Sequence, residues 1–390
     1  MSAPLRVHLV AGEPSGDHLG ADLMRALRTL TGGAVEFRGV GGPAMAREGL
    51  QSLFPMSDVT LMGFDAVVRA LPRVLSRIRE TAADVVAAKP DALVLIDSPD
   101  FTHRVARRAR RALPDLYVVD YVSPTVWAWR PGRAKAMRAY VDLVLAVLPF
   151  EPAAHERLGG PRCVYVGHPL VEKLGALRPD AAEAAARASG PPLVLALPGS
   201  RRSEVGRLMA PFGTALGLLR GRIGAFDLAL PAMPHVEEAI RSAAADWPVA
   251  PRILVGEDAK LAAFRRARAA LAASGTATLE LALAGVPTVG AYRVSPVESL
   301  LRFVVTAPHV LLPNLVLERR AIPELLQADC TPGKLADALA PLVPPASLAR
   351  EAQVAALAEL DRRMALPGGE APSMAAARAT LEGLDAKRRR

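Results

Sequence analysis

Short apolar segments alternate with longer amphipathic segments along most of the chain, a pattern typical of parallel α/β proteins. The strands predicted in the first half are residues 7–11, 92–96, 117–122, 143–148 and 164–166. A second series of predicted strands comprises residues 193–197, 227–230, 252–255, 269–273 and 288–292. Because helix-length segments lie between the strands, the sequence predicts two α/β halves, each with a parallel sheet.

A stretch rich in Ala, Pro and Gly separates the two series and is typical of a linker. We therefore expect an N-terminal domain of residues 1–169 and a C-terminal domain of residues 170–342. Residues 343–390 follow, with two further helix-like segments. Ligands of such sheets bind beyond the carboxyl ends of the strands, so substrates are expected in a cleft between the two halves.

The segment of residues 269–293 has the layout of half a nucleotide-binding unit, with a strand, a glycine turn, a helix and a second strand. The turn at Ser274, Gly275 and Thr276 directs backbone N–H groups and the positive end of a helix dipole to one point, which suits a phosphate. Glu280 follows among apolar neighbours, where a carboxylate needs a partner. Either it binds a sugar hydroxyl beside the phosphate, or it bonds nearby backbone next to an ordinary turn.

Carboxylates and tryptophans follow the predicted strands of the first half. Glu13 lies in the loop after the first strand, where Ser15 is expected to cap the next helix and leave Glu13 facing the cleft. Asp97 directly follows the second strand, a suitable place for a general base, and Asp100 in the same turn is a candidate cap. The loop of residues 121–130 holds two of the three tryptophans, which either pack in the core or line a sugar site.

A second loop suited to an anion follows the predicted strand at residues 193–197. Ser200 and Arg201 lie there in a Gly-Ser-Arg-Arg turn, which favours a diphosphate because guanidinium groups bind phosphate oxygens in pairs. The motifs G-x-G-x-x-G, G-x-x-x-x-G-K-[ST] and G-x-S-x-G do not occur. Their absence weakens the case for a dinucleotide-dependent enzyme, a P-loop NTPase or a serine hydrolase of the elbow type.

Composition narrows the class of protein further. The 390 residues are 51% hydrophobic with a mean hydropathy of +0.22, which excludes disorder. The formal charge of +9 allows a nucleic acid, a membrane surface or an anionic substrate as partner. Aromatic residues make up only 4% and do not interleave with basic residues, so nucleic acid is not expected.

Neither a metal nor a membrane span is expected. Cys163 and Cys330 lie far apart, and no histidine has the spacing of metal ligands. The first residues lack the features of a signal peptide, and no uncharged apolar run approaches the ~18 residues that span a bilayer. We therefore expect a cytoplasmic protein.

An apolar stripe with flanking arginines precedes Pro72. Its members are Met62, Phe64, Val67, Val68 and Leu71. Pro72 is expected to end one helix and to begin another that contains Val74, Leu75 and Ile78. The stripe faces either the core, as amphipathic helices usually do, or an acidic membrane surface, which apolar groups rimmed by arginine also suit.

In motifs spread in order over nearly its whole length, the chain resembles the lipid-A-disaccharide synthases. The motifs are AGEPSGD (11–17), GVGGPAMAREGL (39–50), IDSPDF (96–101), YVSPTVWAWRP (121–131), LPFE (148–151), VGHPL (166–170), LPGSRRSEV (197–205), ASGTATLELALAGVPTVGAYRVS (273–295), LPN (312–314) and PELLQ (323–327). The resemblance implies a GT-B fold, with two Rossmann-like domains and a cleft between them.

The resemblance also implies an activity. It is an inverting, metal-independent glycosyl transfer, without a cofactor, from UDP-2,3-diacylglucosamine to 2,3-diacylglucosamine 1-phosphate. The products are the β-1,6-linked lipid A disaccharide 1-phosphate and UDP. The enzyme would work as a peripheral protein at the inner face of the inner membrane of a Gram-negative bacterium.

Matched motif by motif, the resemblance assigns roles to particular residues. Asp97 matches the proposed general base, and Glu13 is expected near it at the cleft. Arg201, next to Ser200, matches an arginine near the donor diphosphate, and Glu280 matches a glutamate that binds the ribose. The other residues expected at the UDP-sugar site are Ser274, Gly275, Thr276, Asn314 and Gln327.

The resemblance also concerns the C-terminal segment. In the family this segment crosses back to the first domain and exchanges between subunits. We therefore expect residues 343–390 to return to the N-terminal domain. The sequence leaves open whether this segment is exchanged between two subunits in a homodimer.

Two other readings of the motifs remain. Another GT-B enzyme that uses UDP-N-acetylglucosamine, such as a 2-epimerase or a peptidoglycan transferase, would share the nucleotide loops but would need no surface for acyl chains. The Asp97 loop and the apolar stripe count against it. A basic nucleic-acid-binding protein would explain the charge, but it would not explain Glu280 within an apolar helix.

Overall fold

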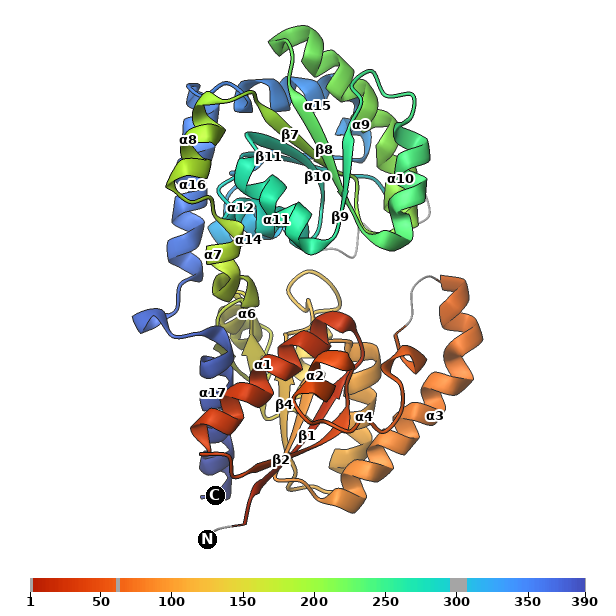
Figure 1. The fold of residues 1–390 in the computed structure, drawn as a ribbon. Helices are drawn as coiled ribbons and strands as arrows, with labels where there is room; N and C mark the ends of the chain where they lie inside the picture. Colours follow the sequence, from red (N-terminus) through yellow and green to blue (C-terminus); the bar gives the residue numbers. More distant parts are fainter. Residues whose placement is uncertain (1–2, 61–63, 295–306, 390) are drawn as a thin grey trace. The chain divides into compact units, whose positions relative to one another are not determined.

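The computed structural model describes residues 3–60, 64–294 and 307–389, with the side chains of residues 64–70 outside the description. The chain divides into two compact units, one of Met1–Pro169 with Leu366–Arg390 and one of Leu170–Ala365. Each unit contains a six-stranded parallel sheet with helices on both faces (Figure 1). The α/β class and the two parallel sheets expected from the sequence are confirmed.

The first unit has the strand order β2-β1-β3-β4-β5-β6. Its strands are β1 (Leu5–Ala11), β2 (Val35–Val40), β3 (Ala92–Ile96), β4 (Tyr117–Tyr121), β5 (Leu143–Ala146) and β6 (Arg162–Tyr165). Its helices are α1 (Pro14–Leu30), α2 (Pro43–Arg47), α3 (Phe64–Ala88), α4 (Pro99–Ala112), α5 (Gly132–Met137), α6 (Glu151–Arg157) and α17 (Pro372–Arg388), with short 3-10 turns η1 (Met56–Asp58) and η7 (Pro367–Gly369). The central strands β3 and β4 are buried throughout because helices cover both of their faces.

The second unit has the strand order β12-β11-β10-β7-β8-β9. Its strands are β7 (Leu193–Leu197), β8 (Asp227–Ala232), β9 (Arg252–Val255), β10 (Ala269–Ala273), β11 (Thr288–Tyr292) and β12 (Glu324–Leu326). Its helices are α7 (Leu174–Leu177), α8 (Ala181–Ser189), α9 (Arg202–Ile223), α10 (Glu237–Ala244), α11 (Glu257–Arg266), α12 (Thr276–Leu283), α14 (Leu312–Leu317), α15 (Pro332–Leu339) and α16 (Leu348–Met364). Short 3-10 turns are η2 (Pro169–Lys173), η3 (Pro234–Val236), η5 (Gln327–Asp329) and η6 (Ala340–Leu342).

Two strands were not predicted from the sequence. In β2 the burial alternates over its first residues, so it offers no continuous apolar run, and β12 has only three residues. Both are edge strands, which pair on one side only. Edge strands need less apolar surface than central strands, which explains why hydrophobic patterning misses them.

The strand order creates one switch point in each sheet. In the first unit, the chain passes from β1 to β2 on one side and to β3 on the other. In the second unit, the same reversal occurs between β7 and β10. Loops at the carboxyl ends of such strand pairs diverge and leave a crevice, which is where ligands of open α/β sheets bind.

The C-terminal segment divides between the units. Helix α16 lies in the second unit, whereas α17 lies beside α1 in the first (Figure 1). Near the end of α17, Gly383 packs on Tyr117 so closely that a Cβ would lie 1.9 Å from the phenol oxygen. Lys387 donates to the carbonyl of Leu116 (3.0 Å), and Arg388 pairs with Asp91 (2.5 Å).

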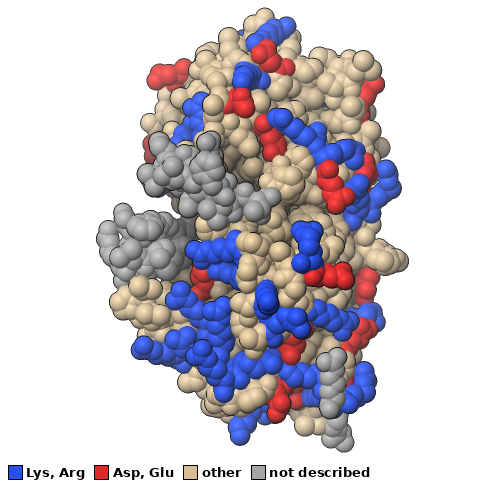
Figure 2. Space-filling model, turned by 180° about the vertical axis from the view of Figure 1, so that it is seen from behind, with Lys and Arg blue, Asp and Glu red and all other residues tan. Residues whose placement is uncertain are grey.

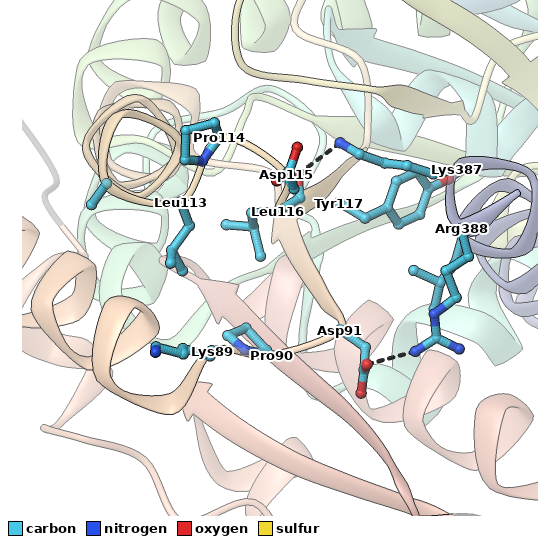
Figure 3. A pocket seen from close by; sticks show the side chains of 12 residues that line it. Lys89, Pro90, Asp91, Leu113, Pro114, Asp115, Leu116, Tyr117, Lys387 and Arg388 are labelled. Atoms are coloured by element: carbon cyan, nitrogen blue, oxygen red, sulfur yellow. Dashed lines mark hydrogen bonds and ion pairs between the residues drawn. The ribbon is translucent and has the colours of Figure 1, made fainter. Parts of the chain in front are cut away.

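These contacts border a cavity of about 500 Å³ (Figure 3). Its lining residues precede β3 and β4, so it lies at the amino ends of these strands, away from the switch point.

Helix α3 corrects one expectation. Pro72 lies inside a single helix of 25 residues and does not separate two helices. Ile78 is fully buried, and Val74 and Leu75 pack against the core of the first unit. A helix tolerates an internal proline when one N–H bond is lost and packing on other turns compensates.

Candidate functional site

Asp97 occupies a tight turn at the carboxyl end of β3, at the switch point of the first unit. Its N–H donates to the carbonyl of Tyr121 (3.0 Å), so pairing with β4 continues one residue beyond the strand. Asp97 and Ser98 have φ angles of 54° and 46°, in the left-handed region. Residues other than glycine rarely adopt this region, and when they do they cluster at functional sites.

The carboxylate of Asp97 is held by hydroxyl and backbone donors. Oδ1 accepts from the N–H of Ser98 (2.7 Å), and Oδ2 faces the hydroxyl of Ser15 at 3.4 Å. The hydroxyl of Thr102 donates to the Asp97 carbonyl (2.9 Å) and fixes the turn. The side chain is half-buried, so it is oriented by the protein and still open to a substrate.

The loop after β1 comes so close to this turn that only glycine fits at position 12. A Cβ on Gly12 would lie 2.9 Å from the Cβ and Oγ of Ser98. Glu13 is exposed and forms the N-cap position of α1. The expected cap by Ser15 is wrong: Pro14 begins the helix, so Ser15 lies within its first turn and meets Asp97 instead. Glu13 and Asp97 therefore follow the two strands that flank one switch point.

Asp100 differs from Asp97 although it lies in the same segment. Its side chain is 85% exposed and pairs with Arg133 at 3.2 Å. Ser98, not Asp100, is the N-cap residue of α4. Asp100 is therefore a surface group of the first helical turn.

The tryptophan loop follows β4, next to the Asp97 turn. Trp127 is partly buried, with its ring edge-on to Phe150 at 5.1 Å and its N–H directed to Glu151 (3.2 Å). Trp129 is also partly buried and lies under the guanidinium of Arg130 at 5.0 Å. Neither ring belongs to the central core of the unit.

In the second unit, a pocket of about 610 Å³ opens at the carboxyl ends of β7, β8, β9 and β10. This position includes the switch point between β7 and β10. The polar residues of its lining are Ser200, Arg201, Glu204, Glu257, Lys260, Ser274, Thr276 and Glu280. Two loops and one helix that were singled out in the sequence therefore meet at one place.

The turn before α12 presents backbone to this pocket. Gly275 has φ 152° and is the N-cap residue of α12, which begins at Thr276 as predicted. Gly275 and Thr276 are exposed. The first N–H groups of a helix have no partner within it, so the amino end of α12 is available to an anion.

Glu280 has a partner that the sequence did not reveal. Both of its oxygens lie 3.2–3.3 Å from Nζ of Lys260, which also contacts Glu257 at 3.0 Å. The side chains of Glu280 and Lys260 are only 17% and 20% exposed. Lys260 lies in α11, which follows β9. A search of the sequence for basic residues that follow the predicted strands would have identified Lys260 as a candidate.

The loop after β7 is fixed by a buried glutamate. Oε2 of Glu204 accepts the N–H groups of Ser200 (3.0 Å) and Arg201 (3.2 Å). Gly199 has φ 113°, and a Cβ there would lie 2.4 Å from Glu204. The Arg201 side chain is 73% exposed and lines the pocket, and its guanidinium pairs with Glu204 at 3.3 Å. Ser203 lies inside α9 and does not cap it.

Asn314 and Gln327 do not line this pocket. Asn314 is fully buried, and its amide bonds Glu324, the carbonyl of Ile322 and the N–H groups of Ala321 and Ile322. Gln327 has φ 50°, and its side-chain oxygen accepts from Val294 at 3.2 Å. Their roles at a UDP-sugar site remain predictions.

The apolar stripe is described only in part. Met62 and the side chains of Phe64, Val67 and Val68 lie outside the described residues. Leu71 is 46% exposed. Lys and Arg gather on the part of the face in Figure 2 that belongs to the first unit. In this unit, α4 exposes Arg104, Arg107, Arg108 and Arg111. Among the helices that the structure describes, none is long and apolar enough to cross a membrane.

Comparison with known proteins gives a consistent match. The model of a family described as lipid-A-disaccharide synthetase matches residues 7–365. The lipid-A-disaccharide synthase of Nitrobacter hamburgensis is 56% identical over 98% of this chain and 96% of its own length. The corresponding protein of Ruegeria pomeroyi is 45% identical over 97% of this chain and 96% of its own length.

Solved structures match over the whole chain at low identity. UDP-GlcNAc 2-epimerase from Neisseria meningitidis has a TM-score of 0.60 at 11% identity, covering 98% of this chain and all of that chain. The calicheamicin glycosyltransferase has a TM-score of 0.58 at 16% identity, covering 100% of this chain and 99% of that one. These likenesses confirm the GT-B fold and show the fold alone.

Proposed function

Because this chain belongs to the lipid-A-disaccharide synthase family, it is a glycosyltransferase of lipid A biosynthesis, and we propose its substrates and mechanism. The donor is UDP-2,3-diacylglucosamine and the acceptor is 2,3-diacylglucosamine 1-phosphate. The acceptor hydroxyl displaces UDP at the anomeric carbon, with inversion, to form a β-1,6 disaccharide 1-phosphate.

The pocket of the second unit supports the proposed binding site of the UDP-sugar donor. It has about 610 Å³, enough for a nucleotide sugar headgroup, and it combines a helix amino end with Arg201 and the Glu280–Lys260 pair. In this proposal the diphosphate binds the N–H groups after Ser274 and the guanidinium of Arg201. The Glu280 carboxylate accepts the ribose hydroxyls, and Lys260 orients it.

Asp97 is the proposed general base that accepts the proton of the acceptor hydroxyl. The attacking hydroxyl must lose its proton as the new glycosidic bond forms, and a carboxylate at the end of a buried strand is oriented well enough to accept it. No salt bridge to Asp97 occurs within residues 3–60, 64–294 and 307–389, so no paired cation blocks its carboxylate from a substrate hydroxyl. Arg201 and the amino end of α12 stabilise the negative charge that grows on the departing UDP.

The location of the reaction is part of the proposal. Both substrates carry acyl chains, so the enzyme works at the inner face of the inner membrane as a peripheral protein. The exposed Leu71 and the basic surface of the first unit support contact with acidic lipid. Residues Asn314 and Gln327 are proposed as further donor contacts, Glu13 as a second cleft carboxylate, and α17 as the segment exchanged in a homodimer.

Substitution of Asp97 tests the mechanism. Asp97→Asn keeps the side-chain shape but removes the base, so kcat should fall by ~10²–10⁴, the usual contribution of general-base catalysis. The affinity for UDP should stay within a few-fold, because UDP binds the other unit. Asp100→Asn is the matched control, and its exposed side chain predicts a much smaller loss. If Asp97→Asn keeps most of its kcat, another carboxylate accepts the proton, and Glu13 is the next to substitute.

A further inference from the structure

Helix α6 holds the tryptophan loop, residues 122–131, at two points that the proposed reaction does not use. Glu151, the first residue of α6, accepts the indole N–H of Trp127 at 3.2 Å. One turn along the helix, Nε2 of His155 bonds the hydroxyl of Ser123 at 2.8 Å. The two bonds pin the loop against one face of α6, because residues four apart on a helix share a face.

Glu151 is a buried carboxylate held by neutral donors. It is 1% exposed, and its second oxygen accepts the N–H of Leu148 at 3.0 Å. No Lys or Arg of the described part of the chain forms a salt bridge with it, and the charged group that acts on it is Asp120, another anion. Burial, with a smaller effect of Asp120, raises the pKa of Glu151 to about 7. Such surroundings destabilise the ionised form of a carboxylate, so a contribution to the stability of the fold does not explain why Glu151 lies there.

The hydrogen bonds of Glu151, which come from the N–H groups of Leu148, Val147 and Trp127, favour its ionised form. Each partner is an N–H donor, so a proton added to the oxygen that faces Trp127 weakens that bond, because a carboxylate oxygen accepts more strongly than a protonated one. Leu148 cannot yield, because its carbonyl accepts the N–H of Glu151 (3.2 Å) in the turn that begins α6. Protonation of Glu151 therefore weakens its hold on the indole of Trp127, which lies in a loop.

The loop adjoins the Asp97 turn directly. Its first residue, Val122, has φ 77°, a left-handed conformation that a β-branched residue adopts only under constraint. The preceding residue, Tyr121, accepts the N–H of Asp97. A shift of the loop would change the space next to the proposed base.

We propose that Glu151 is a positioning residue of the acceptor site. Its ionised carboxylate holds the Trp127 indole, and with it the tryptophan loop, beside Asp97 in the arrangement that orients the acceptor sugar. The expected effect of Glu151 on the kinetics of the acceptor rests on the proposed function. The contact between Glu151 and Trp127 can be tested without catalytic turnover.

Groups that face Glu151 from neighbouring elements do not obscure its titration. On β6, burial raises the pKa of the Cys163 thiol and brings the pKa of Tyr165 to about 12, so both stay neutral around pH 7. On α6, burial lowers the pKa of His155. On β4, Asp120 is the remaining facing charge, and its carboxylate bonds His103 at 3.2 Å rather than the loop.

A spectroscopic titration tests the contact. In a Trp129→Phe, Trp247→Phe background, Trp127 is the one remaining tryptophan. Its fluorescence should change with a midpoint near pH 7 in this background, and the change should disappear in Glu151→Gln. Glu156→Gln is the matched control, because Glu156 is an exposed residue of the same helix and should leave the transition in place. A transition that persists in Glu151→Gln overturns the proposal.

Kinetics test the consequence. At pH 8, Glu151→Gln should lower kcat/KM for the acceptor by roughly 10- to 100-fold, the effect of a small misplacement near the chemistry, with KM for the donor unchanged. In the parent enzyme, kcat/KM for the acceptor should fall as Glu151 is protonated below about pH 7, and Glu151→Gln should lack this acid limb of the pH profile. Trp127→Phe removes the same hydrogen bond from the other side and should reproduce both the loss of kcat/KM and the missing acid limb. The double variant should lose no more than either single variant, because both act through one contact.

Two kinetic results would also overturn the inference: losses that multiply in the double variant, or a Trp127→Phe enzyme with a normal pH profile. The pH profile of Trp127→Phe tests the inference even when Glu151→Gln fails to fold. If no variant, including the parent, makes a disaccharide, the proposed function fails, whereas the fluorescence titration still decides whether Glu151 holds the loop.

Discussion

Glu280→Ala probes the donor pocket most directly. Its carboxylate is bonded to Lys260 at 3.2–3.3 Å and is 17% exposed. When UDP binds, the same oxygens are expected to accept ribose hydroxyls. A hydrogen bond to a charged group contributes about 1.5–3 kcal/mol, and water can replace the second bond in a pocket open to solvent. UDP affinity should therefore fall by roughly 10- to 150-fold.

Isothermal titration calorimetry with UDP measures this change, and a thermal melt verifies folding. Glu257→Gln provides the control, because Glu257 also contacts Lys260 (3.0 Å) but is 61% exposed. An exposed ion pair contributes at most about 1 kcal/mol, so this variant should change the UDP affinity by less than about fivefold. Unchanged affinity in a folded Glu280→Ala protein would refute the ribose contact and leave Glu280 as the partner of Lys260 alone.

Two further predictions concern the membrane and pH. Leu71→Ser should reduce binding to liposomes of acidic lipid and leave UDP binding intact. Leu218 of the second unit is similarly exposed (43%), and the control variant Leu218→Ser should reduce neither liposome binding nor UDP binding. Equal losses of liposome binding in the two variants would contradict a membrane role for α3. Because burial raises the pKa of Glu151 from 4.5 to about 7, its folded form favours the proton, so its contribution to the free energy of unfolding is complete below about pH 4.5 and is lost as pH rises through 7. Urea unfolding between pH 4.5 and 8 should show wild type losing roughly 3 kcal/mol relative to Glu151→Gln; parallel curves would contradict it.

Central strands and strand-end loops were predictable because they depend on local patterns. The apolar runs of β3, β7 and β10 leave no polar face, and the turn at Gly275 is encoded by adjacent residues. The helix predicted at residues 276–284 is α12 (Thr276–Leu283), and Gly285, predicted to stop it, has a left-handed conformation just beyond it.

Contacts between distant segments were not predictable. Lys260 lies 20 residues from Glu280, and Trp127 lies 24 residues from Glu151. Nothing in the local sequence links either pair, because the sheet order brings their loops together. Ser15 shows the same limit: a good capping residue by type, it lies inside the helix and meets Asp97 from another strand end.

The central claim is the transfer of an acylated sugar, and mass spectrometry of the product tests it most directly. The purified chain is incubated with 2,3-diacylglucosamine 1-phosphate and either UDP-2,3-diacylglucosamine or UDP-N-acetylglucosamine. The account predicts a tetraacylated disaccharide 1-phosphate and UDP from the diacylated donor, and little product from the other. Disaccharide formed with equal efficiency from UDP-N-acetylglucosamine would contradict it.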